Sequence, residues 1–379
     1  MHGIKTNVLT TGARAISASA TAVIGLICTA TAAAGAPTTA LNAAFPLNTP
    51  VLVTDVRAAI ANAGTGGTLL PSLEAIYDQC SPRVVVVRVA DDTEANVIGS
   101  AGDYTGLHAL LAAESLTGSR PRVIGAPGLD TEDVTAALVT VAKKLRGMVY
   151  AAAIGDTVAE AVTYRATFQD RELMLLWPNW SGDFAGDAVA RALGLRAQID
   201  EQQGWHKTLS NVAVGGVTGV SQNLFFDIQD ETTDVSALND AQITALVRSP
   251  SGGFIYWGNR TTSAEPLFAF EAATRTSQVL QDEIAAGLMW AADKPLTAFL
   301  VKDVIETINA RIRTLVVQQR LIGGRAWFDP ALNDQADLAA GKLVIDYEFT
   351  PAAPLEGLEL NQRITDKYYA DLSAQLAAA

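Results

Sequence analysis

The sequence predicts an α/β region followed by a smaller α+β region, with an extended strand near each end of the chain. Between about residues 51 and 177, short apolar runs alternate with helical patterns, which is typical of helices layered on a sheet. From residue 268 two long amphipathic helices and then strands follow, so we expect a domain boundary near residue 265. Near both termini apolar and polar residues alternate with period two, which indicates strands with one apolar face.

The N-terminal strand is predicted from the side chains that share one face, namely Ile16, Ala18, Ala20, Ala22 and Ile24. No partner strand lies close to it in the sequence. Its backbone N–H and C=O groups must therefore pair with the chain's own sheet or with another subunit.

The stretch 15–34 also resembles a signal peptide or a weak membrane span, because Lys5 and Arg14 precede it and small residues end it. Its many Ser and Thr residues and its alternation argue against a signal core. An exported envelope protein stays open as an alternative. No other segment approaches the length of a membrane helix.

In the α/β region we predict five strands, at residues 51–53, 83–89, 122–126, 148–154 and 172–177. The strand at 83–89 is apolar on both faces, which predicts a central place in a covered sheet. The helices between the strands carry sequence signals for their N- and C-termini. Thr54 and Asp55 open one that ends at Gly64. Residues 130–133 place an N-cap and negative charge at the start of another, whose last turn carries Lys143, Lys144 and Arg146.

The rest of this region is predicted to hold one long helix and one short strand. The helix spans about residues 187–203, and an aromatic strand follows at 254–257. The Gly/Thr/Ser-rich segment 214–221 and the acidic segment 227–234 between them read as surface loops.

The C-terminal region begins with helices predicted at 271–292 and 301–319, and strands at 325–328 and 342–349 follow. In the last of these strands Leu343, Ile345 and Tyr347 share one face.

After a link with prolines at 351 and 354, the alternation returns at Leu358, Leu360 and Ile364, before a short polar tail. These residues need a pairing partner as the N-terminal strand does. The sequence therefore predicts a chain built to be joined to copies of itself.

Composition limits the class of protein. The chain has 379 residues, 49% of them apolar and 18% charged, which predicts a folded protein of two or three domains. A net charge of −13 argues against a general nucleic-acid binder. The two cysteines, Cys28 and Cys80, are far apart and have no metal-type spacing, so neither a disulfide framework nor a zinc site is expected.

No catalytic, cofactor-binding or metal-binding residue is predicted. His2, His108 and His206 have no second ligand or nucleophile at a diagnostic spacing. The glycine-rich segment 64–68 follows a helix and lacks the lysine of a phosphate-binding loop. The acidic residues at 91–92 and around 230 lack the spacing of a calcium loop. An α/β enzyme with an unrecognised site stays open as an alternative.

The second long C-terminal helix has an excess of positive charge in an acidic chain. Five polar residues fall roughly opposite its apolar face: Lys302, Glu306, Asn309, Arg313 and Arg320. An i,i+4 ion pair of Lys302 with Glu306, together with the helix dipole, gives one explanation for these residues. The other explanation is a docking face for an acidic partner.

Five ordered segments carry a family resemblance: 204–211, 256–260, 290–295, 341–347 and 362–368. In sequence, order and spacing they resemble the tail sheath protein of temperate contractile-tailed bacteriophages and R-type pyocins. The similarity runs from about residue 12 to residue 372. Shortened loops at 91–103 and 181–187 and a plain alanine tail depart from the family pattern, and they affect surface segments only.

The resemblance implies a structural subunit that polymerises as stacked hexameric rings around an inner tube and contracts to drive the tube through a bacterial envelope. It implies a self-assembling protein in a virion tail or pyocin particle, assembled in the host cytoplasm. The further partners implied are the tail tube, baseplate and tail terminator proteins, without nucleic acid and without membrane insertion. No cofactor is implied.

The resemblance also assigns roles to the regions. Residues 1–22 become an N-terminal arm, 23–265 an outer α/β domain, 266–364 an inner, tube-facing α+β domain, and 365–379 a C-terminal arm. The arms would add strands to neighbouring subunits, and the basic helix would contact the tube. A type VI secretion-like sheath component is a further alternative, although such sheaths are made from two different chains.

Overall fold

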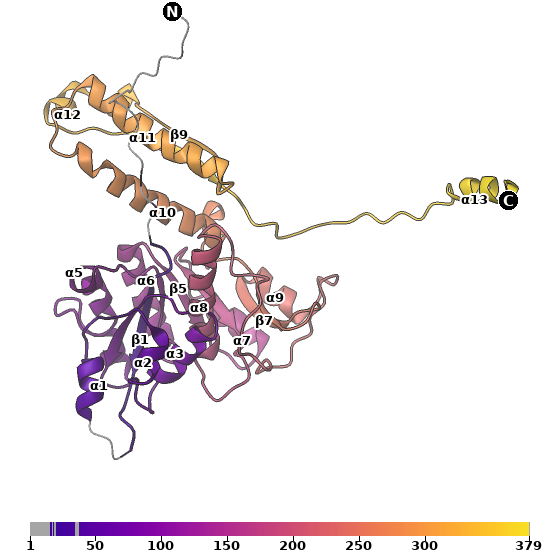
Figure 1. Ribbon diagram of the computed structural model, residues 1–379, viewed down its shortest axis with the longest axis horizontal. Helices are drawn as coiled ribbons and strands as arrows, with labels where there is room; N and C mark the ends of the chain where they lie inside the picture. Colours follow the sequence, from indigo (N-terminus) through magenta and orange to yellow (C-terminus); the bar gives the residue numbers. More distant parts are fainter. Residues whose placement is uncertain (1–15, 17, 19, 35–37, 379) are drawn as a thin grey trace, which may run out of the picture.

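The computed structural model describes residues 16, 18, 20–34 and 38–378. Within this part the chain forms an α/β body, a smaller unit of helices and strands beside it, and a long C-terminal tail (Figure 1). Among the described residues, no helix is both long and apolar enough to cross a membrane.

The body is built on one eight-stranded sheet with the order β2-β3-β1-β4-β5-β6-β7-β8. Its six inner strands run parallel, and the two edge strands β2 and β8 run antiparallel to their neighbours. The strands are β1 (Ile24–Thr29), β2 (Val51–Val53), β3 (Val84–Val89), β4 (Val123–Gly125), β5 (Met148–Ala152), β6 (Leu173–Trp177), β7 (Ile243–Arg248) and β8 (Phe254–Trp257).

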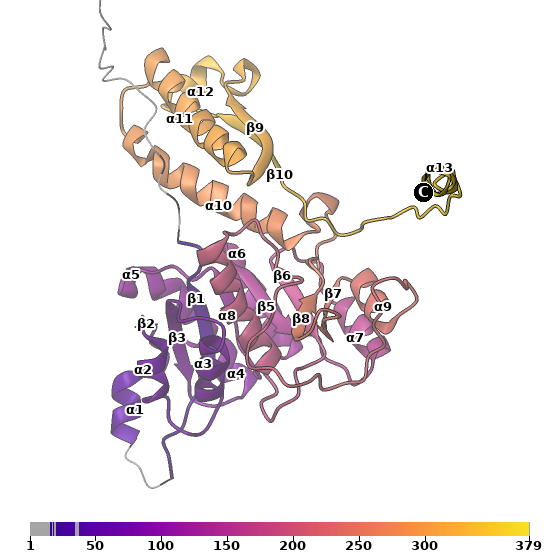
Figure 2. The ribbon, with the colours of Figure 1, turned by 45° about the vertical axis from the view of Figure 1, so that its right-hand side comes forward.

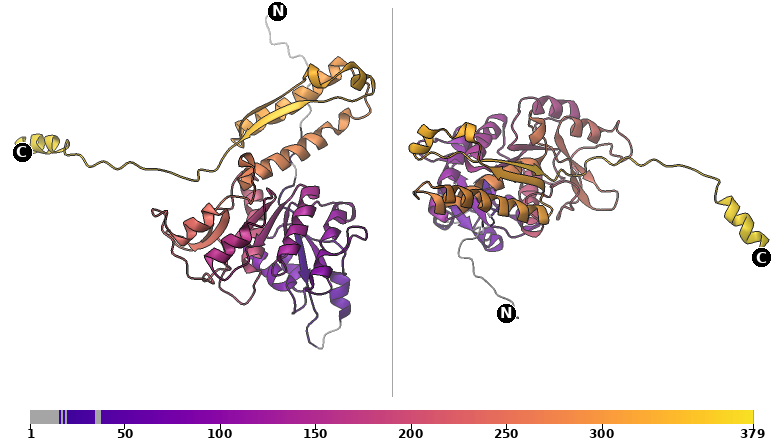
Figure 3. Two further views of the ribbon diagram at one scale, coloured as in Figure 1. Left: turned by 180° about the vertical axis from the view of Figure 1, so that it is seen from behind. Right: turned by 90° about the horizontal axis from the view of Figure 1, so that it is seen from above.

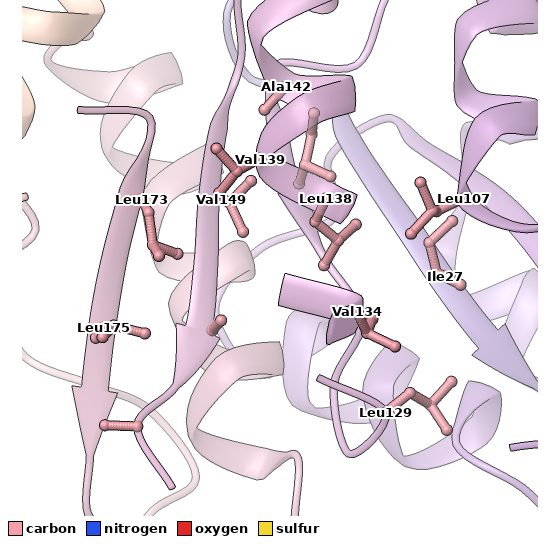
Figure 4. Close-up of a cluster of buried hydrophobic side chains, with 14 of the residues drawn as sticks. Ile27, Leu107, Leu129, Val134, Leu138, Val139, Ala142, Val149, Leu173 and Leu175 are labelled. Carbon is pink, nitrogen blue, oxygen red and sulfur yellow. The ribbon is translucent and has the colours of Figure 1, made fainter. Parts of the chain in front are cut away.

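Helices cover both faces of this sheet, as the sequence predicts. One face packs under α1 (Thr38–Ala44), α2 (Val56–Ile60), α3 (Leu69–Tyr77) and α8 (Asp187–Gln202). The other packs under α4 (Glu94–Ile98), η1 (Gly106–Ala112), α5 (Ala113–Thr117), α6 (Glu132–Leu145), α7 (Val158–Arg165) and α9 (Asp234–Asp240). Figure 4 shows this second core, with Val139 of α6 beside Val149 of the sheet.

β1 and β7 are missing from the sequence prediction. We assigned Ile24 to a terminal strand, but all six residues of β1 are buried and the strand lies between β3 and β4. Gly25 allows close packing there, because a Cβ at this position would lie 2.8 Å from Pro121 Cβ. A signal peptide cleaved within 15–34 would remove this inner strand, so the structure argues against the export alternative.

The smaller unit contains α10 (Glu271–Leu288), η3 (Met289–Ala291), α11 (Ala298–Val317), η4 (Pro330–Leu332), α12 (Gln335–Ala339), β9 (Leu321–Trp327) and β10 (Asp346–Pro351). A short turn, η2 (Pro266–Phe268), precedes it. In Figure 2, α10 runs between the body and α11. The two predicted helices are confirmed with shifted ends, since Thr297 caps α11 by accepting from Leu300 N.

The chain ends in an extended tail. Residues 352–368 contain no helix or strand, and α13 (Tyr369–Ala377) follows. Figure 3 shows the tail leaving the rest of the molecule, with α13 at its far end.

Candidate assembly interface

β9 and β10 form a two-stranded antiparallel sheet that packs on α11. Asp346 pairs with Trp327 at one end and Pro351 with Leu321 at the other. Its inner face joins the core of the smaller unit, together with α10 and α11. The buried members of this core are Trp205, Val279, Leu280, Ile284, Val304, Ile308, Ile312, Leu315, Leu321 and Ala326.

The predicted strand at 342–349 is shorter than expected and finds a partner in its own chain. Tyr347 lies in β10 opposite Ala326 of β9, whereas Leu343 and Ile345 lie outside the strand. The Asn333 amide explains the late start. It donates to Val344 O at 2.9 Å and accepts from Val344 N at 2.8 Å, so these groups are already used before the ladder begins.

The outer edges of β9 and β10 bond to no other strand within the described part of the chain. A two-stranded sheet is marginal alone and here depends on α11 for one covered face. The outer edge of β9 is already used in part, because the N–H and C=O of Ala326 bond the Asn309 side chain of α11. The outer edge of β10 therefore offers a further strand the better place to pair.

The charged helix face is smaller than the sequence predicts. Lys302, Glu306 and Arg313 of α11 are exposed, but for Asn309 and Arg320 the expectation of an open face is wrong. The Asn309 amide accepts from Ala326 N at 2.7 Å and donates to Ala326 O at 3.1 Å, which fixes α11 on β9.

Arg320 lies beyond the end of α11, and its guanidinium stacks over the Trp205 ring at 4.4 Å from the centroid. Arg311, another of the basic residues, makes a two-bond pair with the buried Glu283 of α10, at 2.8 Å for each bond. Glu306 pairs with Arg313 instead of the predicted Lys302. Most of the positive charge on α11 is thus already neutralised within the chain.

The C-terminal tail starts from a fixed point on the body. Arg260 donates to the two carboxylate oxygens of Glu356 at 2.8 and 2.6 Å. The hydrogen bonds to Glu356 raise the pKa of Arg260 above its usual range. Beyond this anchor Leu358, Leu360 and Ile364 are 70%, 80% and 97% exposed, so the predicted apolar face has no cover in the described chain.

The described part of the N-terminal arm forms no strand. Ile16 is buried against α10, where Gly287 makes room for it, since a Cβ on Gly287 would lie 2.5 Å from Ile16 Cγ1. Ala18 and Ala20 are exposed. Most of the predicted arm, including residues 1–15, lies outside the described residues.

A buried charge cluster holds the start of α10 to the body. Arg196 bonds Asp200 of its own helix at 2.7 Å and Glu271 of α10 at 3.2 Å. Arg275 also pairs with Asp200, and the Tyr150 hydroxyl donates to Glu271. Burial and the nearby Glu271 raise the pKa of Tyr150 well above its usual value. Two cations and two carboxylates thus balance within the junction.

A second ion cluster lies further along α10. Asp282 accepts from Arg122, at the start of β4, and from Arg146, at the end of α6. Burial lowers the pKa of Arg122 to about 10, against the opposing effect of Asp282. The two clusters fix the orientation of α10, and therefore of the smaller unit, relative to the body. Sequence patterns do not reveal either cluster, because their members come from distant segments.

The described residues contain no group of three His, Cys, Asp or Glu side chains able to hold a metal ion. Burial lowers the pKa of His108 and His206 and raises that of Cys80 to about 12, so burial disfavours the charged form of each group. An open strand edge and an extended tail are features through which one subunit can attach to another.

Comparisons with known proteins identify the family of the chain. Three family models match the chain: the phage tail sheath protein central domain over residues 102–262, the phage tail sheath C-terminal domain over 263–365, and the tail sheath protein Gp18 domain III N-terminal region over 21–89. Both the central and the C-terminal domain models match within one chain.

Individual relatives cover nearly the whole chain. The tail sheath protein of Escherichia phage P2 is 48% identical, covering 98% of this chain and 97% of the phage protein. The major tail sheath protein of Serratia phage KSP20 is 46% identical, covering 88% of this chain and 89% of its own length. The contracted helical sheath of the anti-feeding prophage has the same fold, with a TM-score of 0.72 at 16% identity, covering 96% of this chain and 99% of that one.

The family consists of structural proteins, which sets aside the enzyme alternative. The chain belongs to the phage tail sheath protein family and is a subunit of a contractile sheath.

Proposed function

We propose that this protein polymerises as stacked hexameric rings around an inner tube and contracts to drive the tube through a bacterial envelope. The observation that carries the proposal is the combination of an exposed tail segment that contains Leu358, Leu360 and Ile364 with a two-stranded sheet whose β10 edge bonds to no other strand in the described part of the chain. Each feature is unstable alone and each supplies what the other lacks. Strand addition between copies satisfies both.

The exposed tail residues Leu358, Leu360 and Ile364 are the side chains that would give this strand its register. Leu343, Ile345 and Tyr347 stay proposed as part of the receiving unit. Because Ile16 is buried on its own α10, an N-terminal strand would begin after it, with Ala18 and Ala20 as its members.

The proposed tube contact is reduced to Lys302, Glu306 and Arg313, which are the exposed members of the predicted set. Exposed ion pairs contribute about 1 kcal/mol or less each. Contacts this weak can hold the extended form in place and still release during contraction.

We keep the proposed domain boundaries after residues 22, 265 and 364. Contraction would move whole subunits as rigid bodies, because the two ion clusters on α10 hold the smaller unit to the body. A stacked polymer has two ends, so baseplate and terminator proteins are expected partners there. The particle would be a virion tail or a pyocin-like body assembled in the bacterial cytoplasm.

Electron microscopy of the purified protein tests the proposal. Rings or tubular polymers are the expected result. A protein that stays a single, monodisperse chain at high concentration would contradict it.

A further inference from the structure

The smaller unit carries an apolar groove at the end opposite the departure of the tail. Its lining includes Leu296, Val301 and Ile305 from the start of α11, Phe328 just after β9, and Leu338 of α12. The groove has a volume of about 930 Å³. These five side chains are half-buried, so an apolar floor stays open to solvent.

The tail ends in a helix that matches such a groove. Tyr369, Leu372 and Leu376 of α13 are 73%, 47% and 69% exposed and stand at positions i, i+3 and i+7, on one face of the helix. Asp371 and Gln375 lie four residues apart on another face. Recognition of an amphipathic helix by an apolar groove uses this spacing of anchors.

α13 finds no support in its own chain. The described side chains of the helix are all exposed, and Figures 1 and 3 show it far from the body. A helix of nine residues is marginal in water without a packing surface. Residues 357–368, which follow the anchor at Glu356, span about 40 Å if extended, which is long enough to reach another copy.

We propose that α13 of one copy docks into the groove formed by α11, Phe328 and α12 of a second copy. This inference rests on the proposed function, which brings copies together through the tail strand. Lys302 is the one charged residue among those that line the groove, and Asp371 is the one charged residue of α13, so the two surfaces have opposite charge. Docking of α13 would cover Lys302 and leave Glu306 and Arg313 for the proposed tube contact.

Strand addition would lead the tail to this groove. β10 starts at Asp346, opposite Trp327 and so near the groove, and runs away from it to Pro351. A tail strand that pairs antiparallel with β10 of the second copy therefore runs toward the groove. Residues 365–368 then connect the strand to α13. The tail would thus contact the second copy twice, first through a strand that sets the register and then through the α13 helix.

Two double variants test the docking in the full chain. Leu372→Asp with Leu376→Asp places two carboxylates on the apolar face, and Ala374→Asp with Gln375→Asp places the same two on other faces. We expect the first variant to raise the critical concentration for polymer formation roughly tenfold or more, and the control to leave it within twofold. Equal behaviour of the two variants would overturn the proposal.

Cross-linking identifies the occupant of the groove. Chains with Leu376→Cys are mixed with chains with Ile305→Cys, assembled and oxidised, with the unmodified protein as the control for Cys28 and Cys80. A disulfide-linked dimer is expected only in the mixture. If a single chain with both substitutions forms an internal disulfide and the mixture forms none, α13 docks on its own chain and the proposal is wrong.

Two other outcomes of these experiments distinguish a failure of the α13 docking from a failure of the proposed sheath function. Polymers without any cross-link would place α13 elsewhere, on the tube or another partner, and would overturn the docking alone. Failure of the unmodified protein to polymerise would overturn the proposed function, and the docking with it.

Discussion

The apolar face of the tail strand gives the sharpest prediction. Replacing Leu358, Leu360 and Ile364 with serine removes three side chains that are 70%, 80% and 97% exposed in the single chain. Full burial of such a side chain contributes about 1.5–3 kcal/mol. When this value is scaled by the three exposed fractions, covering all three side chains at an interface contributes about 4–7 kcal/mol. The cost of ordering the backbone of the tail is the same in both proteins and cancels from the comparison.

The substitution should therefore weaken assembly and leave the single chain unaffected. At about 1.4 kcal/mol per factor of ten, the critical concentration for polymers should rise at least roughly a hundredfold. Sedimentation and electron microscopy measure this, and denaturant unfolding checks that the free energy of unfolding of the monomer is unchanged.

A matched control uses the other face of the same strand. Glu359→Ser, Asn361→Ser and Arg363→Ser change the same number of residues without changing net charge, and they should assemble normally. Normal assembly of the apolar-face variant, or equal failure of the control, would refute strand addition through this face.

Three further predictions concern the rest of the chain. Glu271→Gln leaves Arg196 and Arg275 with Asp200 alone, so it should lower the free energy of unfolding by about 3–5 kcal/mol. Glu348→Gln, in the exposed pair with Arg325, should lower it by less than about 1 kcal/mol. Equally small effects of the two variants in chemical denaturation would show that the buried cluster does not stabilise the junction. Gly287→Val should displace Ile16 from α10, which increased proteolysis of the N-terminal segment would reveal; unchanged cleavage would mean that this contact does not hold the arm. Burial raises the pKa of Asp130 to about 6, so the folded protein binds this proton more tightly than the unfolded chain, and the contribution of Asp130 to stability falls as pH rises from about 4 through 6. Asp130→Asn, which can still accept from Ala152 N, should flatten this part of the plot of unfolding free energy against pH. An identical plot for the variant would contradict the assignment.

Local patterns were enough to predict most of the fold. β2 and β8 were predicted with their observed bounds, and β3, with its six buried residues, was recognised because it is apolar on both faces. β1 was missed because Ser, Thr and Ala precede it in alternation, which resembles an edge strand, and only its neighbours β3 and β4 make it an inner strand.

The interface was predictable only in part. The period-two alternation predicts a strand with Leu358, Leu360 and Ile364 on one face, but in the single chain residues 357–368 form no strand and are all exposed, so the strand stays a prediction. The helical pattern could not show that Asn309 bonds the backbone of Ala326, because that contact depends on how β9 lies on α11. Anchoring of the tail by Arg260 likewise joins residues 96 positions apart, and such contacts leave no periodic signal.

The most direct test is a density map of the assembled polymer at side-chain resolution. The account predicts that residues 358–364 of one copy form a third strand beside the two-stranded sheet of another copy, with Leu358, Leu360 and Ile364 covered. A map in which this segment pairs with its own chain, or stays uncovered between well-ordered subunits, would contradict it.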